Sequence, residues 1–153
     1  MEQVYIAPNA TVVGDVELHK NVNIWYGAVL RGDCGKITVG EGTNIQDNAV
    51  VHDETTLGKN CTVGHSAIIH GCTIGDDCLI GMGAIVLSGA VLGNGCLVGA
   101  GALVTGKTNA PDGSILLGSP AKVVKTMTPE QLEESRRNAA HYIELGQKAF
   151  GNK

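Results

Sequence analysis

A repeat of six residues runs through most of this chain and constrains its fold more than any other feature. Ile, Leu or Val recurs at every sixth position in three runs: Ile6, Val12, Leu18, Ile24 and Leu30; Val39, Ile45, Val51, Leu57, Val63 and Ile69; and Ile74, Ile80, Val86, Leu92, Val98 and Val104. One such repeat is too short to bury an apolar face, whereas stacked repeats share a continuous core. The period therefore predicts an all-β fold of short parallel strands that stack on one another.

A second, smaller inward position follows each of these aliphatic residues by four. It holds Ala10, Val16, Val22, Ala28, Cys34, Thr43, Ala49, Thr55, Cys61, Ala67, Cys78, Ala84, Ala90, Cys96 and Ala102. Glycine, with 22 residues, often follows the aliphatic position, and we expect Gly and Asn at the corners because turns often need a positive φ. Aromatic residues make up only 3% of the chain, so small aliphatic side chains must fill the core.

This pattern resembles the hexapeptide-repeat, left-handed parallel β-helix superfamily over roughly residues 6–120. The resemblance implies that three repeats make one triangular coil and that residues 18 apart stack directly. Two steps break the period: nine residues separate Leu30 from Val39, and five separate Ile69 from Ile74. We expect a loop around residues 31–36 at the first break and a one-residue deletion at the second, and such irregularities are where function concentrates.

The repeat fades after Val104, and the last part of the chain has helical signals. Thr128-Pro129-Glu130-Gln131 has the residues of a helix start, with Thr as N-cap, Pro at the first position and Gln at N3. We expect a β-helix domain over residues 1–127 and, within 128–150, a C-terminal α-helix over about 129–148 that packs on its outside. The preceding segment 117–122 resembles the end of many hexapeptide-repeat proteins, acyltransferases included.

Composition excludes several classes of protein. The formal net charge of −4 and the pI of about 5.7 do not fit the basic footprint of a nucleic-acid-binding protein. No apolar run approaches the roughly 18 residues of a membrane span, and the start of the sequence lacks the features of a signal peptide. Five cysteines without CxxC spacing fit a reducing compartment, so we expect packed free thiols and a cytoplasmic protein without membrane or nucleic-acid partners.

Three histidines form the candidate metal set. His52 and His70 each follow an aliphatic inward residue by one and are 18 residues apart, so their imidazoles should stack on one edge and reach one metal ion. His65 has a different phase and lies five residues before His70, which is up to about 16 Å of extended chain. We therefore expect His65 to bind the metal ion that His52 and His70 of a neighbouring subunit hold. The favoured assembly is a ring of three subunits.

The polar residues around these histidines point to one family. Arg31-Gly32-Asp33, Asn44-Ile45-Gln46-Asp47-Asn48, Val51-His52 and the segment 64–71 together resemble the γ-class carbonic anhydrases. The match is ordered along the chain and includes polar positions that packing does not require.

The resemblance implies the roles of individual residues. His52, His65 and His70 would be zinc ligands in a homotrimer, with iron or cobalt as alternative metals because imidazole suits several. Gln46 would orient the bound water or bicarbonate, and Arg31 and Asp47 would pair across the subunit interface near Asp33. Tyr142 of the C-terminal helix is a further candidate. The implied reaction is the reversible hydration of CO₂ to bicarbonate by metal-bound hydroxide.

The sequence departs from the most active members of that family, which carry a Glu beside the Arg-Gly-Asp segment and an acidic loop after the first ligand. Here Cys34 stands near the first place, and only Asp53 and Glu54 with two threonines follow His52. Three alternatives therefore stay open: a CoA-dependent acyltransferase, a metal-dependent thioester hydrolase on the same scaffold, and a metal-binding protein with little catalytic activity.

Overall fold

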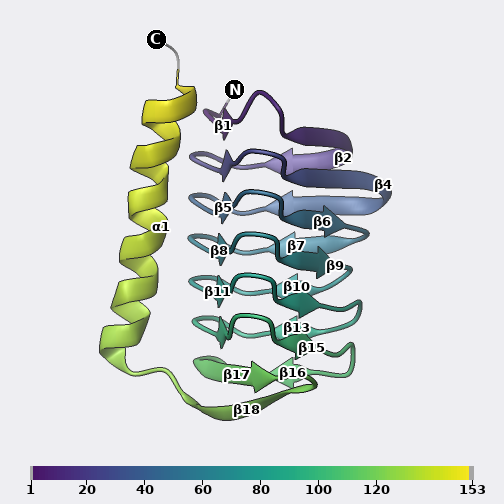
Figure 1. Cartoon of the computed structure of the whole chain (residues 1–153), viewed down its shortest axis with the longest axis vertical. Coiled ribbons are helices and arrows are strands. Elements are labelled where there is room, and N and C mark those ends of the chain that lie inside the picture. Colours follow the sequence, from purple (N-terminus) through teal and green to yellow (C-terminus); the bar gives the residue numbers. More distant parts are fainter. Residues whose placement is uncertain (1, 152–153) are drawn as a thin grey trace.

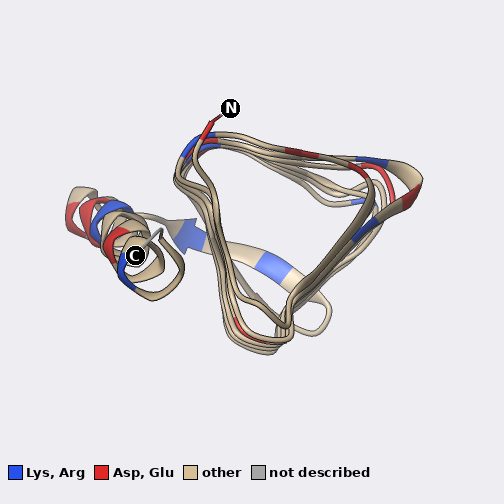
Figure 2. Cartoon of the chain, turned by 90° about the horizontal axis from the view of Figure 1, so that it is seen from above, with Lys and Arg blue, Asp and Glu red and all other residues tan. Residues whose placement is uncertain are grey.

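The chain folds into a left-handed parallel β-helix with one α-helix along its outside (Figure 1). The computed structural model describes residues 2–151. Viewed from above, the coils superimpose as a triangle with one corner drawn out, and the helix stands beside one wall (Figure 2). The fold class predicted from the repeat is therefore confirmed.

Three walls of short parallel strands form the triangle. The first wall, which the helix covers, contains β1 (Tyr5–Ile6), β3 (Asn23–Ile24), β5 (Asn44–Ile45), β8 (Thr62–Val63), β11 (Leu79–Ile80), β14 (Leu97–Val98) and β17 (Ser114–Gly118). The second wall contains β6 (Val50–His52), β9 (Ile68–His70), β12 (Ile85–Val86) and β15 (Leu103–Val104). The third wall contains β7 (Thr55–Leu57), β10 (Thr73–Ile74), β13 (Val91–Leu92) and β16 (Asn109–Ala110).

Two long strands, β2 (Thr11–Leu18) and β4 (Val29–Val39), continue from the second wall into the third. The chain bulges outward over residues 31–36 as expected, but this segment lies within β4 and does not form a separate loop. The nine-residue step produces this bulge: Asp15 alone in β2 stands where β4 has Asp33, Cys34, Gly35 and Lys36. The strands approach so closely that a Cβ at Gly14 would lie 2.6 Å from the Gly32 carbonyl oxygen. Arg31 and Asp33 are exposed on this bulge.

The aliphatic positions of the repeat form the core. From Ile24 to Val104 all of them are at most 2% exposed, because each is covered by the coils above and below. The first coil departs from the expectation: Ile6 is 36% exposed, and Val12 and Leu18 are only partly buried, since no further coil of the described chain covers that end. Cys34 is also exposed rather than inward, because the extra residues of the bulge give its inward place to Ile37.

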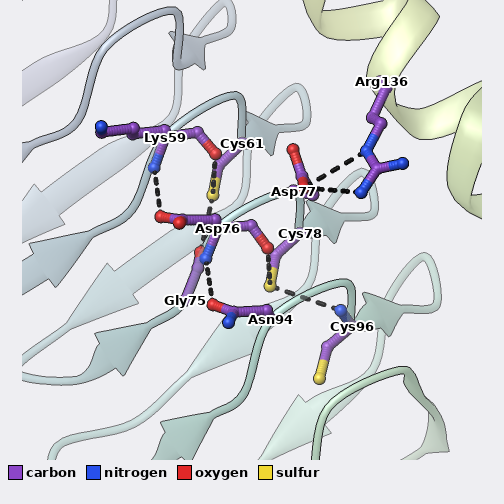
Figure 3. Close-up of polar contacts among 9 residues, drawn as sticks. All are labelled: Lys59, Cys61, Gly75, Asp76, Asp77, Cys78, Asn94, Cys96 and Arg136. Carbon is purple, nitrogen blue, oxygen red and sulfur yellow. Dashed lines mark hydrogen bonds and ion pairs between the residues drawn. The ribbon is translucent and has the colours of Figure 1, made fainter.

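A column of buried thiols lines the corner between the third and first walls (Figure 3). Each thiol donates to a main-chain carbonyl of the following coil: Cys61 to Gly75 at 3.0 Å, Cys78 to Gly93 at 3.1 Å and Cys96 to Pro111 at 3.4 Å. Contact with Cys61 and then burial raise the pKa of the Cys78 thiol to about 12. The described cysteines are all free, and this column donates to partly buried main-chain carbonyls at the corner.

The chain ends by folding back along the first wall. Strand β18 (Ala121–Thr126) pairs antiparallel with β17 and leads into α1 (Pro129–Phe150), which begins with the predicted capping box at Thr128. The helix contacts β1, β3, β5 and β8, and a Cβ at Gly146 would lie 2.8 Å from Asn23 Cβ. Arg136 ties it to Asp77 at 3.3 Å (Figure 3). Among the described residues, no helix is long and apolar enough to cross a membrane.

Candidate metal centre

His52 and His70 lie side by side on the second wall. They end the neighbouring parallel strands β6 and β9 and are in register, which follows directly from their separation of 18 residues. His52 Nδ1 is 3.2 Å from His70 Nε2. We call these two residues the paired-histidine half-site.

Each imidazole of this half-site has a second polar contact. His70 Nδ1 is 2.8 Å from Ser88 Oγ, and His52 Nε2 is 2.9 Å from Asp33 Oδ1. Ser88 therefore leaves His70 Nε2 for another partner, since a contact at one ring nitrogen selects the tautomer at the other. Sequence reasoning missed Ser88, because β9 stacks on β12 with a step of 17 residues, Ile69 on Val86, and the rule of 18 therefore does not place Ser88 beside His70.

Asp33 links the bulge to the paired-histidine half-site. Its Oδ2 lies 2.5 Å from Arg31 Nη1. The hydrogen bond from Arg31, followed by the contact with His52, lowers the pKa of the Asp33 carboxyl to about 2. The negative charge of Asp33 in turn raises the pKa of the neighbouring Cys34 thiol. Arg31 pairs with Asp33 within the chain, and its pairing with Asp47 across an interface stays a prediction.

His65 lies at the opposite edge of the second wall, where β8 turns into β9. Its Nδ1 is 3.0 Å from Asp47 Oδ1, and the two residues occupy equivalent positions of successive coils. His65 also lines a groove of about 430 Å³ together with Gln46 and Tyr142. These four residues, Gln46, Asp47, His65 and Tyr142, are the His65 half-site.

Neighbouring side chains hold Gln46 and Tyr142 in this groove. Gln46 is 5% exposed and donates from Nε2 to Asn44 Oδ1 at 3.1 Å. The Tyr142 ring packs edge-on against Trp25, with 5.5 Å between centroids. Burial and then the charge of Asp47 raise the pKa of the Tyr142 hydroxyl, so this hydroxyl is a hydrogen-bond donor at neutral pH.

One chain does not assemble the three histidines. Among residues 2–151, the group of three or more possible metal ligands with all ligand atoms within 4.8 Å of one another consists of Asp33, Cys34 and His52. The groove at His65 includes neither His52 nor His70. The two half-sites thus stand at the two edges of one wall, each with side chains that orient its imidazoles.

Comparison with known proteins relates this arrangement to a family. The chain is 46% identical over 156 residues to "Gamma carbonic anhydrase 2, mitochondrial" of Arabidopsis thaliana, covering 95% of this chain and 56% of that protein. It is 47% identical over 150 residues to the "Probable carbonic anhydrase" of Methanocaldococcus jannaschii, covering 95% of this chain and 94% of that protein. The chain belongs to the γ-class carbonic anhydrase-like family. It spans little more than half of the length of the plant relative.

Two further comparisons concern the scaffold of this γ-class family member. The family described as "Bacterial transferase hexapeptide (six repeats)" matches residues 71–106. Among solved structures, a "hexapeptide transferase family protein" from Anaplasma phagocytophilum superimposes with a TM-score of 0.93 at 47% identity, covering 96% of this chain and 89% of that chain. The β-helix and its C-terminal helix therefore recur together in a relative.

Proposed function

We propose that this protein is a metal-dependent enzyme of the carbonic anhydrase type that hydrates CO₂ reversibly at sites shared between the chains of a homotrimer. His52 and His70 of one chain and His65 of its neighbour would hold a zinc ion. The observation that carries the proposal is the in-register His52–His70 pair, with its ring nitrogens 3.2 Å apart. Family membership supports it.

The donor set fits zinc. Two imidazole nitrogens bound at 2.0–2.1 Å to a tetrahedral ion lie about 3.3 Å apart, close to the separation of His52 Nδ1 and His70 Nε2. The partners of His70 and His65 at Nδ1, Ser88 and Asp47, leave Nε2 of each ring for the metal, which is the usual outer arrangement of a zinc-bound histidine.

The wall between the two half-sites supports the shared site. Its outward residues Val29, Val50, Ile68, Ile85 and Leu103 stack in register, and Ile68 is 37% exposed. The third wall instead presents Thr38, Thr56, Thr73, Val91 and Asn109. An apolar wall with half a metal site at each edge suits a cyclic assembly, in which one surface edge meets a different one on the neighbour.

The chain's own residues would bind and orient the substrate. Gln46 uses one amide hydrogen on Asn44, so its carbonyl oxygen and second amide hydrogen remain for water or bicarbonate. Tyr142 offers a protonated hydroxyl in the same groove. A zinc ion, when bound, would supply the chemistry by lowering the pKa of a coordinated water towards about 7.

Proton export is where this chain differs from the most active members of its family. Asp33, with a pKa of about 2, cannot store a proton at neutral pH, and Cys34 stands near the place where those members have Glu. We therefore expect the hydration rate to rise with the concentration of an external buffer that accepts the proton.

We also propose a cytoplasmic location for this chain, whereas the Arabidopsis relative is named as mitochondrial.

The test is CO₂ hydration by zinc-reconstituted protein, followed with a pH indicator at several buffer concentrations. We expect activity in the wild type and in the control His19→Ala, whose imidazole contacts Glu2 and Glu17, and loss of activity in His70→Ala. Zinc-loaded wild type that does not exceed the uncatalysed rate would overturn the proposal in favour of a metal-binding protein with little turnover. Binding of CoA by zinc-free protein would favour the acyltransferase instead.

A further inference from the structure

A second group of metal ligands lies at the bulge, within a single chain. The possible ligand atoms of Asp33, Cys34 and His52 all lie within 4.8 Å of one another. Asp33 and Cys34 are exposed in β4, and His52 comes from the adjacent strand β6. Three donor types, oxygen, sulfur and nitrogen, thus meet at the drawn-out corner of the triangle.

Contacts within the group orient its ligand atoms towards one another. Asp33 Oδ1 already lies 2.9 Å from His52 Nε2, whereas Asp33 Oδ2 is taken by Arg31. One carboxylate oxygen therefore faces the imidazole while the guanidinium holds the carboxylate in place. Ligands of a tetrahedral zinc ion lie about 3.3–3.8 Å apart, so small side-chain rotations suffice to bring the three atoms around one ion.

We propose that Asp33, Cys34 and His52 form a second divalent-metal site that a single chain can fill without a neighbour. A thiolate with an imidazole and a carboxylate prefers zinc, cobalt or cadmium over magnesium or calcium, which take oxygen ligands. On binding, the Cys34 thiol releases its proton to solvent, and the carboxylate and thiolate neutralise the charge of the ion. Solvent completes the coordination, because the site is open.

His52 also belongs to the shared site, so the two sites compete; this consequence rests on the proposed function. A neutral imidazole has one nitrogen with a free lone pair. His52 Nδ1 faces His70 and His52 Nε2 faces Asp33, so a neutral His52 serves one metal at a time. In a separated subunit, the intrachain site would hold the metal ion. When the trimer forms and a neighbour supplies His65, His52 would leave the intrachain site and bind the metal ion of the shared site.

The experiment is a Co²⁺ titration of the full-length His65→Ala variant, which lacks the third ligand of the shared site but keeps the bulge group intact. Thiolate bound to Co²⁺ gives a charge-transfer absorption in the near ultraviolet, whereas imidazole and carboxylate ligands do not. We expect this band to saturate at one cobalt per chain and to vanish in His65→Ala/Cys34→Ser. The control His65→Ala/Cys96→Ser, which alters a buried thiol, should keep it.

The two proposals fail separately. A missing band in His65→Ala, or a band that persists after Cys34→Ser in protein with an unchanged circular dichroism spectrum, overturns the second site and leaves the shared site untouched. A band in His65→Ala that disappears with Cys34→Ser supports the second site, even where the wild type proves inert towards CO₂.

Discussion

A shared site makes a quantitative prediction for mixtures of two inactive variants. In a cyclic trimer each site would take His52 and His70 from one chain and His65 from the next. His65→Ala destroys one side of every site and His70→Ala the other, so each variant alone has none. A mixed trimer regains a site wherever a chain with an intact pair precedes a chain with an intact His65.

The activity that the mixture should recover can be calculated from random assembly of the two variants. When equal amounts of the two variants are unfolded together and refolded into random cyclic trimers, an interface carries an intact site with a probability of about one quarter. We therefore expect the mixture to show about 25% of wild-type CO₂ hydration per chain, where the separate variants show none. Native mass spectrometry would verify that mixed trimers have formed.

A matched mixture controls for non-specific recovery. His52→Ala mixed with His70→Ala should regain nothing, because both substitutions damage the same half-site. His52→Ala mixed with His65→Ala should recover about as much as the first mixture, since those lesions lie on opposite sides. Mixed trimers that stay as inactive as their components would refute the shared site.

Three further predictions concern single side chains. Ser88→Ala removes the Oγ that contacts His70 Nδ1 and should weaken zinc binding about 10- to 100-fold in chelator competition; unchanged affinity would show that Ser88 does not orient the ring. Cys78→Ala removes the thiol that donates to the partly buried Gly93 carbonyl and should lower the free energy of unfolding in urea by about 0.5–1.5 kcal/mol, whereas Cys78→Ser should cost less; equal losses would contradict this role of the thiol. Because Arg31 holds the folded pKa of Asp33 at about 2, below its usual 3.8, this pairing should stabilise the metal-free protein above about pH 4 and be lost as the pH falls through 2. Carboxyl NMR measures the midpoint, and a value near 3.8 would disprove the pairing.

The architecture was predictable from the spacing of residues because a β-helix converts sequence distance into spatial distance. Positions 18 apart, such as Val50 and Ile68, stack as neighbouring strands, and the one-residue deletion shortens the next step, so that Ile68 stacks on Ile85. The stacking of His52 on His70 follows from the same rule. The C-terminal helix was predictable from its capping residues, which are a local signal.

The errors lie where the period fails. The bulge stays within a strand because the residues before it, up to Gly32, and after it, from Ile37, both pair with β2, and spacing alone cannot show this. The phase of the repeat placed Cys34 inside, whereas Ile37 fills that place. The first coil follows the period but lies at an open end, so Ile6 stays exposed.

The sequence by itself determined the stack of coils, the pairing of His52 with His70 and the different phase of His65, since all three depend only on residue counts along a regular repeat. Only the tertiary structure decided which side chains orient these imidazoles and that Asp33, Cys34 and His52 converge at one corner. It also decided that the helix brings Tyr142 to the groove beside His65. These contacts depend on the path of a bulge and on the docking of a helix, which side-chain packing sets and no period encodes.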